Sequence, residues 1–316
     1  MLYLKKVFIF FICIMVLFLF PNGTVRALDD MVERIVKIAV IDTGISTSAI
    51  DSEKIGQGYN YIEDNEDTED LIGHGTAIAG ILVGDRLENV KGIIPNALLI
   101  PLVCQTKDRD NKVTAGNHEI LARAIRDAID LFDCRIINIS NGVVEESAIL
   151  HEAVKYAEEK NVLVIASVGN SQKENPNALY YPAAYSAVIG VGSVNSRGQI
   201  STFSQRNQSV NIMAEGEKIW TISKNGKQLM TQGTSYATAY VTGAVATLLS
   251  TRPTLTANQV RNILYGSAKD IHTKGYDTDS GWGIIQMTKA LEWAESIPSF
   301  PKSIFLKSSN TQFQQM

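Results

Sequence analysis

Hydrophobic runs rich in β-branched residues alternate with segments of helical periodicity along most of this chain. Five runs have apolar residues at consecutive positions, and so on both faces of an extended chain: residues 36–41, 98–103, 135–140, 162–167 and 187–194. Strands that are apolar on both faces and alternate with helices form a parallel sheet covered by helices on both sides. The sequence therefore predicts an α/β fold of three layers.

Two intervening segments, residues 117–131 and 147–160, repeat apolar residues with the 3.6-residue period of a helix. A further helix is expected to begin after Thr256, because Thr256 and Gln259 have the spacing of a capping box. Ligands of such sheets bind at the carboxyl ends of the strands. Polar residues that follow the predicted strands are therefore candidates for one common site.

The composition fits one large core, since 45% of the 316 residues are hydrophobic. The formal net charge is −4 and no stripe of basic residues is present. This charge excludes the electrostatic footprint of a nucleic-acid-binding protein.

The N-terminus has the pattern of a secretory signal. Lys5 and Lys6 precede an apolar run over residues 7–20, and a segment typical of a signal-peptide cleavage site ends at the small residue Ala27. The run is shorter than the roughly 20 residues of a membrane span. We expect a signal peptide over residues 1–27, a catalytic domain over 28–297 and a loose C-terminal tail over 298–316. The alternative is an uncleaved signal anchor. Removal of the signal would bring the net charge to about −7.

Three segments carry the parts of a nucleophilic site. Asp42 ends the first apolar run, His74 opens a helix of small residues, and Ser235 opens the apolar helical run 237–249 after a glycine turn. A helix N-terminus behind a hydroxyl favours developing negative charge. An acid, an imidazole and a hydroxyl held at the ends of regular elements are typical of a catalytic triad.

The segments around these residues resemble those of the subtilisin-like serine proteases, in which the three groups follow one another in the order Asp, His, Ser. The matching stretches are VIDTG at 40–44, HGTAIAG at 74–80, ASVGN at 166–170, YPAAY at 181–185 and GTSYAT at 233–238. The resemblance extends from about residue 37 to residue 294. It implies the subtilisin-like fold and serine endopeptidase activity through an acyl-enzyme.

The resemblance also implies roles for residues beside the triad. Asn170 corresponds to the family's donor to the oxyanion. The pocket for the residue before the scissile bond would have two walls, Ser140, Asn141 and Gly142 on one side and Ser167, Val168 and Gly169 on the other. Tyr180 is a candidate to cap this pocket.

The chain departs from the family pattern in several places. Tyr236 stands where Met is usual, and Ala239 where Pro is usual, with only a slight expected effect on catalysis. Only residues 28–36 separate the signal from the first strand, so we expect no long folding pro-segment.

Metal binding and the cysteines give weaker expectations. The family's calcium loop corresponds to residues 84–89, where Arg86 and an apparent shortening argue against an ion; structural calcium stays an open alternative, and no cofactor is needed for catalysis. The acidic segment 63–70 could be a solvated loop, a cation site or a rim that attracts basic substrates. If residues 98–103 and 135–140 are neighbouring parallel strands, as in the family, Cys104 and Cys134 lie at opposite ends of the sheet, and we expect both to be buried and reduced.

The sequence thus predicts a secreted, monomeric serine endopeptidase that acts on a peptide or protein, with no nucleic-acid partner and no stable membrane span after signal removal. The small size and the acidic segment favour a processing enzyme over a scavenging protease. Some small relatives that lack pro-segments remove leader peptides from bacterial peptide antibiotics, and this chain resembles them at that level only. The alternative from another class is a catalytically weak member of the fold that serves as a binding or immunity protein.

Overall fold

The computed structural model describes residues 35–87, 89–108 and 110–297. The expected signal peptide over residues 1–27 and the expected tail over residues 298–316 lie outside the described residues. Within these ranges, no helix is both long and apolar enough to cross a membrane.

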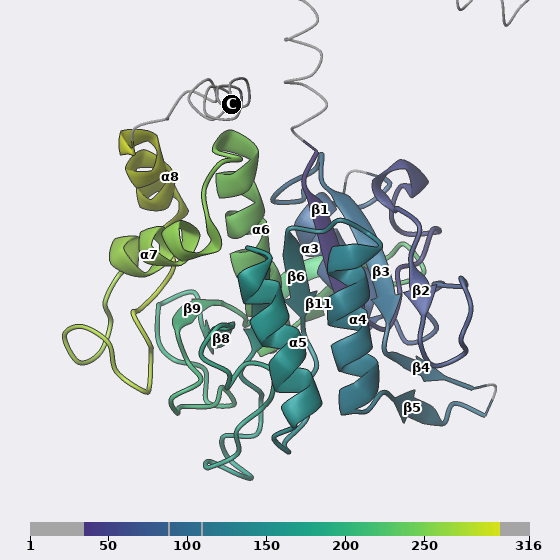
Figure 1. The fold of residues 1–316 in the computed structure, drawn as a ribbon, viewed down its shortest axis with the longest axis horizontal. Helices are drawn as coiled ribbons and strands as arrows, with labels where there is room; N and C mark the ends of the chain where they lie inside the picture. Colours follow the sequence, from purple (N-terminus) through teal and green to yellow (C-terminus); the bar gives the residue numbers. More distant parts are fainter. Residues whose placement is uncertain (1–34, 88, 109, 298–316) are drawn as a thin grey trace, which may run out of the picture.

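The centre of the molecule is a parallel sheet, as predicted, and it has seven strands (Figure 1). Its strand order is β2-β3-β1-β6-β7-β8-β9. The bounds are β1 Lys37–Asp42, β2 Tyr59–Asn60, β3 Leu98–Val103, β6 Ile136–Ile139, β7 Leu163–Ser167, β8 Ile189–Val194 and β9 Ile212–Glu215. All five predicted strands are present, and β2 and β9 extend the sheet at its two edges.

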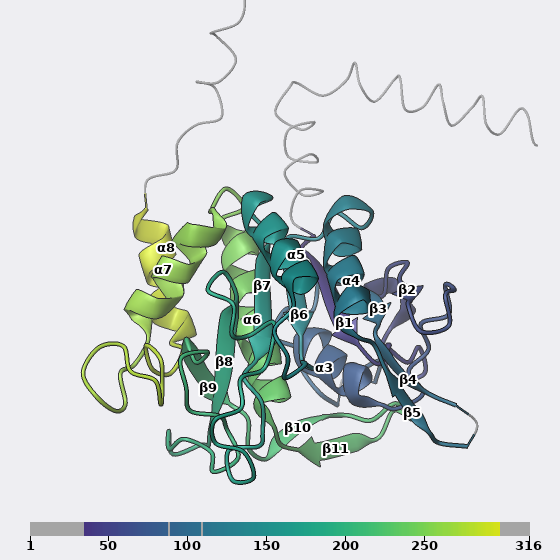
Figure 2. The ribbon, with the colours of Figure 1, turned by 60° about the horizontal axis from the view of Figure 1, so that its bottom comes forward.

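Helices cover both faces of the sheet and complete the three layers (Figures 1 and 2). On one face lie α4 (His118–Asp130) and α5 (Ala148–Glu159), which pack against each other. On the other face lie α3 (His74–Val83) and α6 (Thr234–Thr251), and α7 (Ala257–Ser267) and α8 (Met287–Ser296) pack beside α6. Two small antiparallel sheets, β4–β5 (Gln105–Lys107 and Val113–Ala115) and β10–β11 (Ile219–Ile222 and Gln228–Thr231), lie at the periphery.

Each strand contributes side chains to two separate cores. Along β1, Ile38 and Val40 pack with α3 and α6, whereas Ala39 and Ile41 pack with α4 and α5. All four are at most 1% exposed. Because both faces are buried, the strand carries the continuous apolar run from which the sheet was predicted.

The helix starts have local causes in the sequence. The side chain of Asn117 caps α4 by accepting a hydrogen bond from the backbone N–H of Ile120 at 3.1 Å. At α7, Thr256 and Gln259 form the predicted capping box, in which each side chain accepts from the backbone N–H of the other.

Both cysteines of the described chain are free and buried, as predicted. Cys104 follows the carboxyl end of β3, and Cys134 precedes the amino end of β6. The strands β3 and β6 are not direct neighbours, because β1 lies between them. This arrangement places the thiols at opposite ends of the sheet.

Candidate active site

Asp42 and His74 meet at the carboxyl edge of the sheet. Asp42 ends β1, is 1% exposed, and its Oδ1 lies 2.7 Å from His74 Nδ1. The same oxygen accepts the backbone N–H of Thr43 at 2.8 Å. A carboxylate at this position stabilises the tautomer with its proton on Nδ1, so Nε2 of the neutral ring is left as an acceptor.

A second buried carboxylate, Asp70, supports the turn that leads into His74. It is 1% exposed and accepts five hydrogen bonds. The donors are Thr43 Oγ1, Thr76 Oγ1 and the backbone N–H groups of Ile72, Gly73 and Thr76. The sequence had placed Asp70 in a continuous acidic surface segment. That placement is wrong for Asp70, although Glu63 to Asp67 and Glu69 are exposed.

The surroundings of His74 shift its pKa. Burial lowers the pKa of the imidazole, but the charge and hydrogen bond of Asp42, together with the charge of Asp70, raise it by more. The net pKa of His74 therefore lies above the ordinary value for histidine. The ring also packs near Tyr236, with the two ring centroids 5.7 Å apart.

Ser235 lies in the first turn of α6. The turn depends on Gly233, whose φ of 151° is rarely adopted by other residues. Ser235 is 6% exposed, and its Oγ donates to the backbone carbonyl of Ser140 at 3.0 Å. Among the described contacts, the hydroxyl is therefore bonded to Ser140 and not to His74. Nucleophile–base hydrogen bonds are often long without substrate, so this geometry does not exclude the pair.

Asn170 follows β7 and is oriented by Thr234. Its Oδ1 accepts the backbone N–H of Thr234 at 2.8 Å and Thr234 Oγ1 at 3.0 Å. Because a backbone N–H can only donate, this contact fixes which end of the amide is oxygen. The Nδ2 group is then left as a donor beside Gly233, two residues before Ser235.

A cavity of about 340 Å³ opens beside Asn170. Five of the six predicted wall residues line it, namely Ser140, Asn141, Gly142, Ser167 and Gly169, together with Asn170, Ser171 and Tyr180. Val168 does not line it, because its side chain is fully buried in the core beneath α4 and α5. The cavity adjoins Ser235 through Ser140, whose Oγ donates to the Ser235 carbonyl at 3.3 Å.

In the described part of the loop at residues 84–89, which leaves out residue 88, the carboxylate of Asp85 is bonded within the loop. The Asp85 carboxylate accepts the backbone N–H groups of Leu87 and Val90 and the side-chain amide of Asn89. These internal donors already occupy the oxygens that a calcium ion would require. Across the described parts of the chain, no three His, Cys, Asp or Glu side chains are grouped to hold a metal ion.

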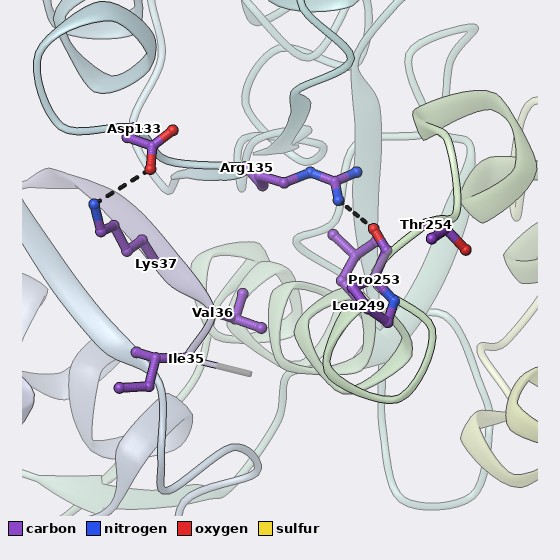
Figure 3. Close-up of a pocket in the computed structure, with 8 residues that line it drawn as sticks. All are labelled: Ile35, Val36, Lys37, Asp133, Arg135, Leu249, Pro253 and Thr254. Atoms are coloured by element: carbon purple, nitrogen blue, oxygen red, sulfur yellow. Dashed lines mark hydrogen bonds and ion pairs between the residues drawn. The ribbon is translucent and has the colours of Figure 1, made fainter. Parts of the chain in front are cut away.

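A second hollow, of about 310 Å³, lies near the amino ends of β1 and β6, and Figure 3 shows the residues that line it. Its polar groups are engaged in contacts that connect elements: Lys37 pairs with Asp133 at 3.4 Å, and Arg135 donates to the carbonyls of Pro253 and Leu255 at 2.6 and 3.0 Å. The first contact joins β1 to the residues before β6, and the second joins those residues to the segment before α7. We therefore assign the hollow a structural role.

Comparison with known proteins bears on what this arrangement does. Residues 33–283 match the family model described as the subtilase family. Subtilisin DY of Bacillus licheniformis is 32% identical over 259 residues, which cover 81% of this chain and 91% of that protein. The major intracellular serine protease of Bacillus subtilis (strain 168) is 36% identical over 223 residues, covering 68% of each chain.

Solved structures with a similar fold include two proteases named for peptide products. A lanthipeptide protease is 25% identical, with a TM-score of 0.71, and the match covers 83% of this chain and 90% of that one. The prenylagaramide maturation protease PagA is also 25% identical, with a TM-score of 0.70 and coverage of 87% and 99%.

Proposed function

Because the chain belongs to the subtilase family of serine endopeptidases, we propose that Asp42, His74 and Ser235 form its catalytic triad. The observation that carries this assignment is the 2.7 Å contact between His74 Nδ1 and the buried Asp42 carboxylate. It leaves His74 Nε2 as the acceptor for a hydroxyl proton. Ser235, at the start of α6, is the hydroxyl that must turn from the Ser140 carbonyl towards it.

The reaction then follows from these groups. His74 Nε2 takes the proton of Ser235 Oγ while the oxygen attacks the substrate carbonyl carbon. The carbonyl oxygen gains the negative charge, which Asn170 Nδ2 and the backbone N–H of Ser235 stabilise. The imidazolium gives its proton to the leaving amine, the peptide bond breaks, and an acyl-enzyme forms. Water activated by His74 hydrolyses this ester and restores Ser235.

The chemistry uses these side chains without a cofactor. Structural calcium remains an alternative from the sequence, but the contacts of Asp85 give no support for an ion in the loop that corresponds to the family's site.

For the biological role, we propose that the enzyme is a processing protease that removes the leader of a modified peptide. This proposal is supported by the likeness to the lanthipeptide protease and to PagA. We further propose a secreted monomer, with a signal over residues 1–27, a catalytic domain over 28–297 and a tail over 298–316. The names of its relatives include both extracellular and intracellular proteases, so secretion rests on the N-terminal pattern.

A serine-reactive fluorophosphonate probe tests the assignment. The wild-type protein should be labelled on Ser235. The Ser235→Ala variant should not be labelled, and its turnover rate should be about 10⁶-fold lower. Circular dichroism of the variant should be unchanged. An unlabelled, folded wild-type protein would indicate the binding or immunity role, and a labelled Ser235→Ala variant would assign the nucleophile to another residue.

A further inference from the structure

The first turn of α6 is held by contacts from outside the helix. Its N-cap residue is Gly233, which has no side chain to accept from the free backbone N–H groups. Asn170 Oδ1 accepts the backbone N–H of Thr234 at 2.8 Å, and Ser140 Oγ donates to the backbone carbonyl of Ser235 at 3.3 Å. The position of the proposed nucleophile therefore depends on how Asn170 and Ser140 are themselves oriented.

A buried chain of hydrogen bonds lies behind Ser140. Asn138 in β6 donates from Nδ2 to Ser140 Oγ at 3.0 Å, and Thr242 Oγ1 in α6 donates to Asn138 Oδ1 at 2.8 Å. Asn138 and Thr242 are fully buried, and Ser140 is 6% exposed. The chain thus begins in the middle of α6, passes through the end of β6 and returns to the first turn of α6 at Ser235.

The last acceptor fixes the direction of every link in this chain. A backbone carbonyl can only accept, so the single hydroxyl proton of Ser140 points to Ser235. Ser140 Oγ must then accept from Asn138, which identifies the facing end of that amide as its nitrogen. The opposite end is the oxygen, and Thr242 has to donate to it. Buried hydrogen bonds that are aligned in this way polarise and strengthen one another.

Thr242 decides the orientation of the Asn138 amide. Without the Thr242 proton, Asn138 Oδ1 would lose its donor in a buried site, which has a free-energy cost. A flipped amide would present its oxygen to Ser140, and the Ser140 proton would then turn from Ser235 to Asn138. The link to the Ser235 carbonyl is the longest of the three, so it is the one most easily lost.

We propose that Asn138, oriented by Thr242, is a positioning residue for Ser235. Through the Ser140 hydroxyl it fixes the backbone that carries the nucleophilic Oγ and the N–H assigned to the oxyanion. The inference rests on the proposed function, because it requires Ser235 to be the nucleophile. Neither Asn138 nor Thr242 lines the cavity beside Asn170, so their loss should slow the chemical step and leave substrate binding nearly unchanged.

Replacing Thr242 by Val keeps the shape of the side chain and removes the proton that begins the chain. We expect Thr242→Val to lower both kcat and the rate of fluorophosphonate labelling about tenfold, with KM within about threefold of wild type. Thr242→Ser restores a hydroxyl and should keep both rates within about threefold of wild type. If Thr242→Val does not fold, Thr242→Ala removes the same proton with a better helix former and carries the same expectation.

The matched control is Thr247→Val, which makes the same change on the same helix. The Thr247 hydroxyl donates to the carbonyl of Gly243 at 2.8 Å, a bond that lies within α6 and has no link to Ser140. This variant should keep the wild-type kcat. All rates are measured well below the unfolding temperature and per folded enzyme, so a loss of stability alone would leave kcat unchanged.

A double variant tests whether the effect passes through Ser140. Ser140→Ala removes the hydroxyl that connects Asn138 to Ser235 and keeps the backbone carbonyl, so it should also lower kcat about tenfold. When Ser140→Ala is combined with the Thr242 variant that folds, the two losses should not multiply, because both changes break one chain.

Fluorophosphonate labelling of the wild-type protein separates the possible failures. If it is labelled, wild-type kcat in the Thr242→Val or Thr242→Ala variant would overturn the positioning inference alone, and so would losses that multiply in the double variant. An equal loss in Thr247→Val would also overturn it, since any weakening of α6 would then slow the reaction. Folded wild-type protein that is neither labelled nor active on any peptide would overturn the proposed function and this inference with it.

Discussion

Asn170 has a side-chain orientation that is fixed before substrate arrives. Its oxygen accepts from the backbone N–H of Thr234, so the amide nitrogen must point the other way. A donor that needs no reorganisation is most effective on charge that appears only in the transition state. The structure thus gives a physical reason for the role that the resemblance implied.

We therefore expect Asn170→Ala to lower kcat by about 10²–10³ with little change in KM, because the lost hydrogen bond forms to the oxyanion. Steady-state kinetics on one peptide would measure this. Asn175→Ala, at an exposed position of the same loop, is the matched control and should behave as wild type. A change confined to KM would contradict the oxyanion role.

Asp70, like Asp42, affects the proposed reaction through the charge of its carboxylate on His74. Its ionised carboxylate stabilises the imidazolium of His74 and so raises the pKa of that ring. The charged groups around the ring are Asp42 at its Nδ1 and Asp70 behind the turn, and Tyr236 packs near its face. Activity requires neutral His74, and so activity is lost as the pH falls through this pKa.

Replacing Asp70 by Asn should move the acid limb of kcat/KM to lower pH, because the imidazolium loses one stabilising charge. The variant should also be less stable, since an amide cannot accept all five donors. Asp67→Asn is the control: Asp67 is exposed, and its charge is screened by water. A limb that stays at the wild-type pH would show that Asp70 acts on the turn alone.

Among the elements, α7 is the helix whose start is most fully encoded in local sequence. Thr256→Ala removes the side-chain oxygen that accepts the N–H of Gln259 at 3.2 Å. We expect a loss of about 1 kcal/mol in the free energy of unfolding, with an unchanged dependence on urea concentration. Thr254→Ala, at an exposed residue before the helix, should change the midpoint of urea unfolding little. Equal midpoints for the two variants would contradict the capping role.

The elements that the sequence predicted are those whose two faces are both buried. The strands β1, β3, β6, β7 and β8 are buried at nearly every position, and most of their residues are apolar. The edge strand β2 is only two residues long, and the hairpin β10–β11 exposes Trp220 and Met230. Neither has a periodic pattern long enough to distinguish it from a loop.

The same reasoning explains where the structure places the predicted site residues. Motifs at strand and helix ends locate Asp42, His74 and Ser235, because the backbone fixes their positions. Val168 lies in the core because side chains alternate beyond β7, so its neighbours Ser167 and Gly169 face the cavity. Burial of Asp70 depends on donors from three separate segments, which the sequence around it does not reveal.

At the scale of the whole molecule, the acidic segment before Asp70 gives one region of the surface a distinct charge. Glu66, Asp67 and Glu69 are exposed, and none of them has a salt bridge to a described residue. Asp64 differs, because Arg123 lies 3.6 Å from its carboxylate and offsets its charge. In the sequence, this segment immediately precedes the turn that carries His74. Its charges are therefore within a few residues of the active-site histidine along the chain.

Carboxylates that flank a substrate channel raise the local concentration of cationic peptides. We expect replacement of Glu66, Asp67 and Glu69 by the matching amides to lower kcat/KM more for peptides with Lys or Arg outside the cavity beside Asn170 than for neutral peptides. The difference should shrink as salt rises, since the Debye length is about 8 Å at physiological ionic strength.

The control triple variant carries the same Glu-to-Gln type of replacement at three exposed acids on α5 and α8: Glu159, Glu292 and Glu295. Both triples change the net charge equally, so an effect of overall charge would appear in each, whereas attraction by the segment would appear only in the first. Equal losses on basic and neutral peptides in the first triple, unchanged by salt, would show that the segment is a solvated surface without influence on substrate.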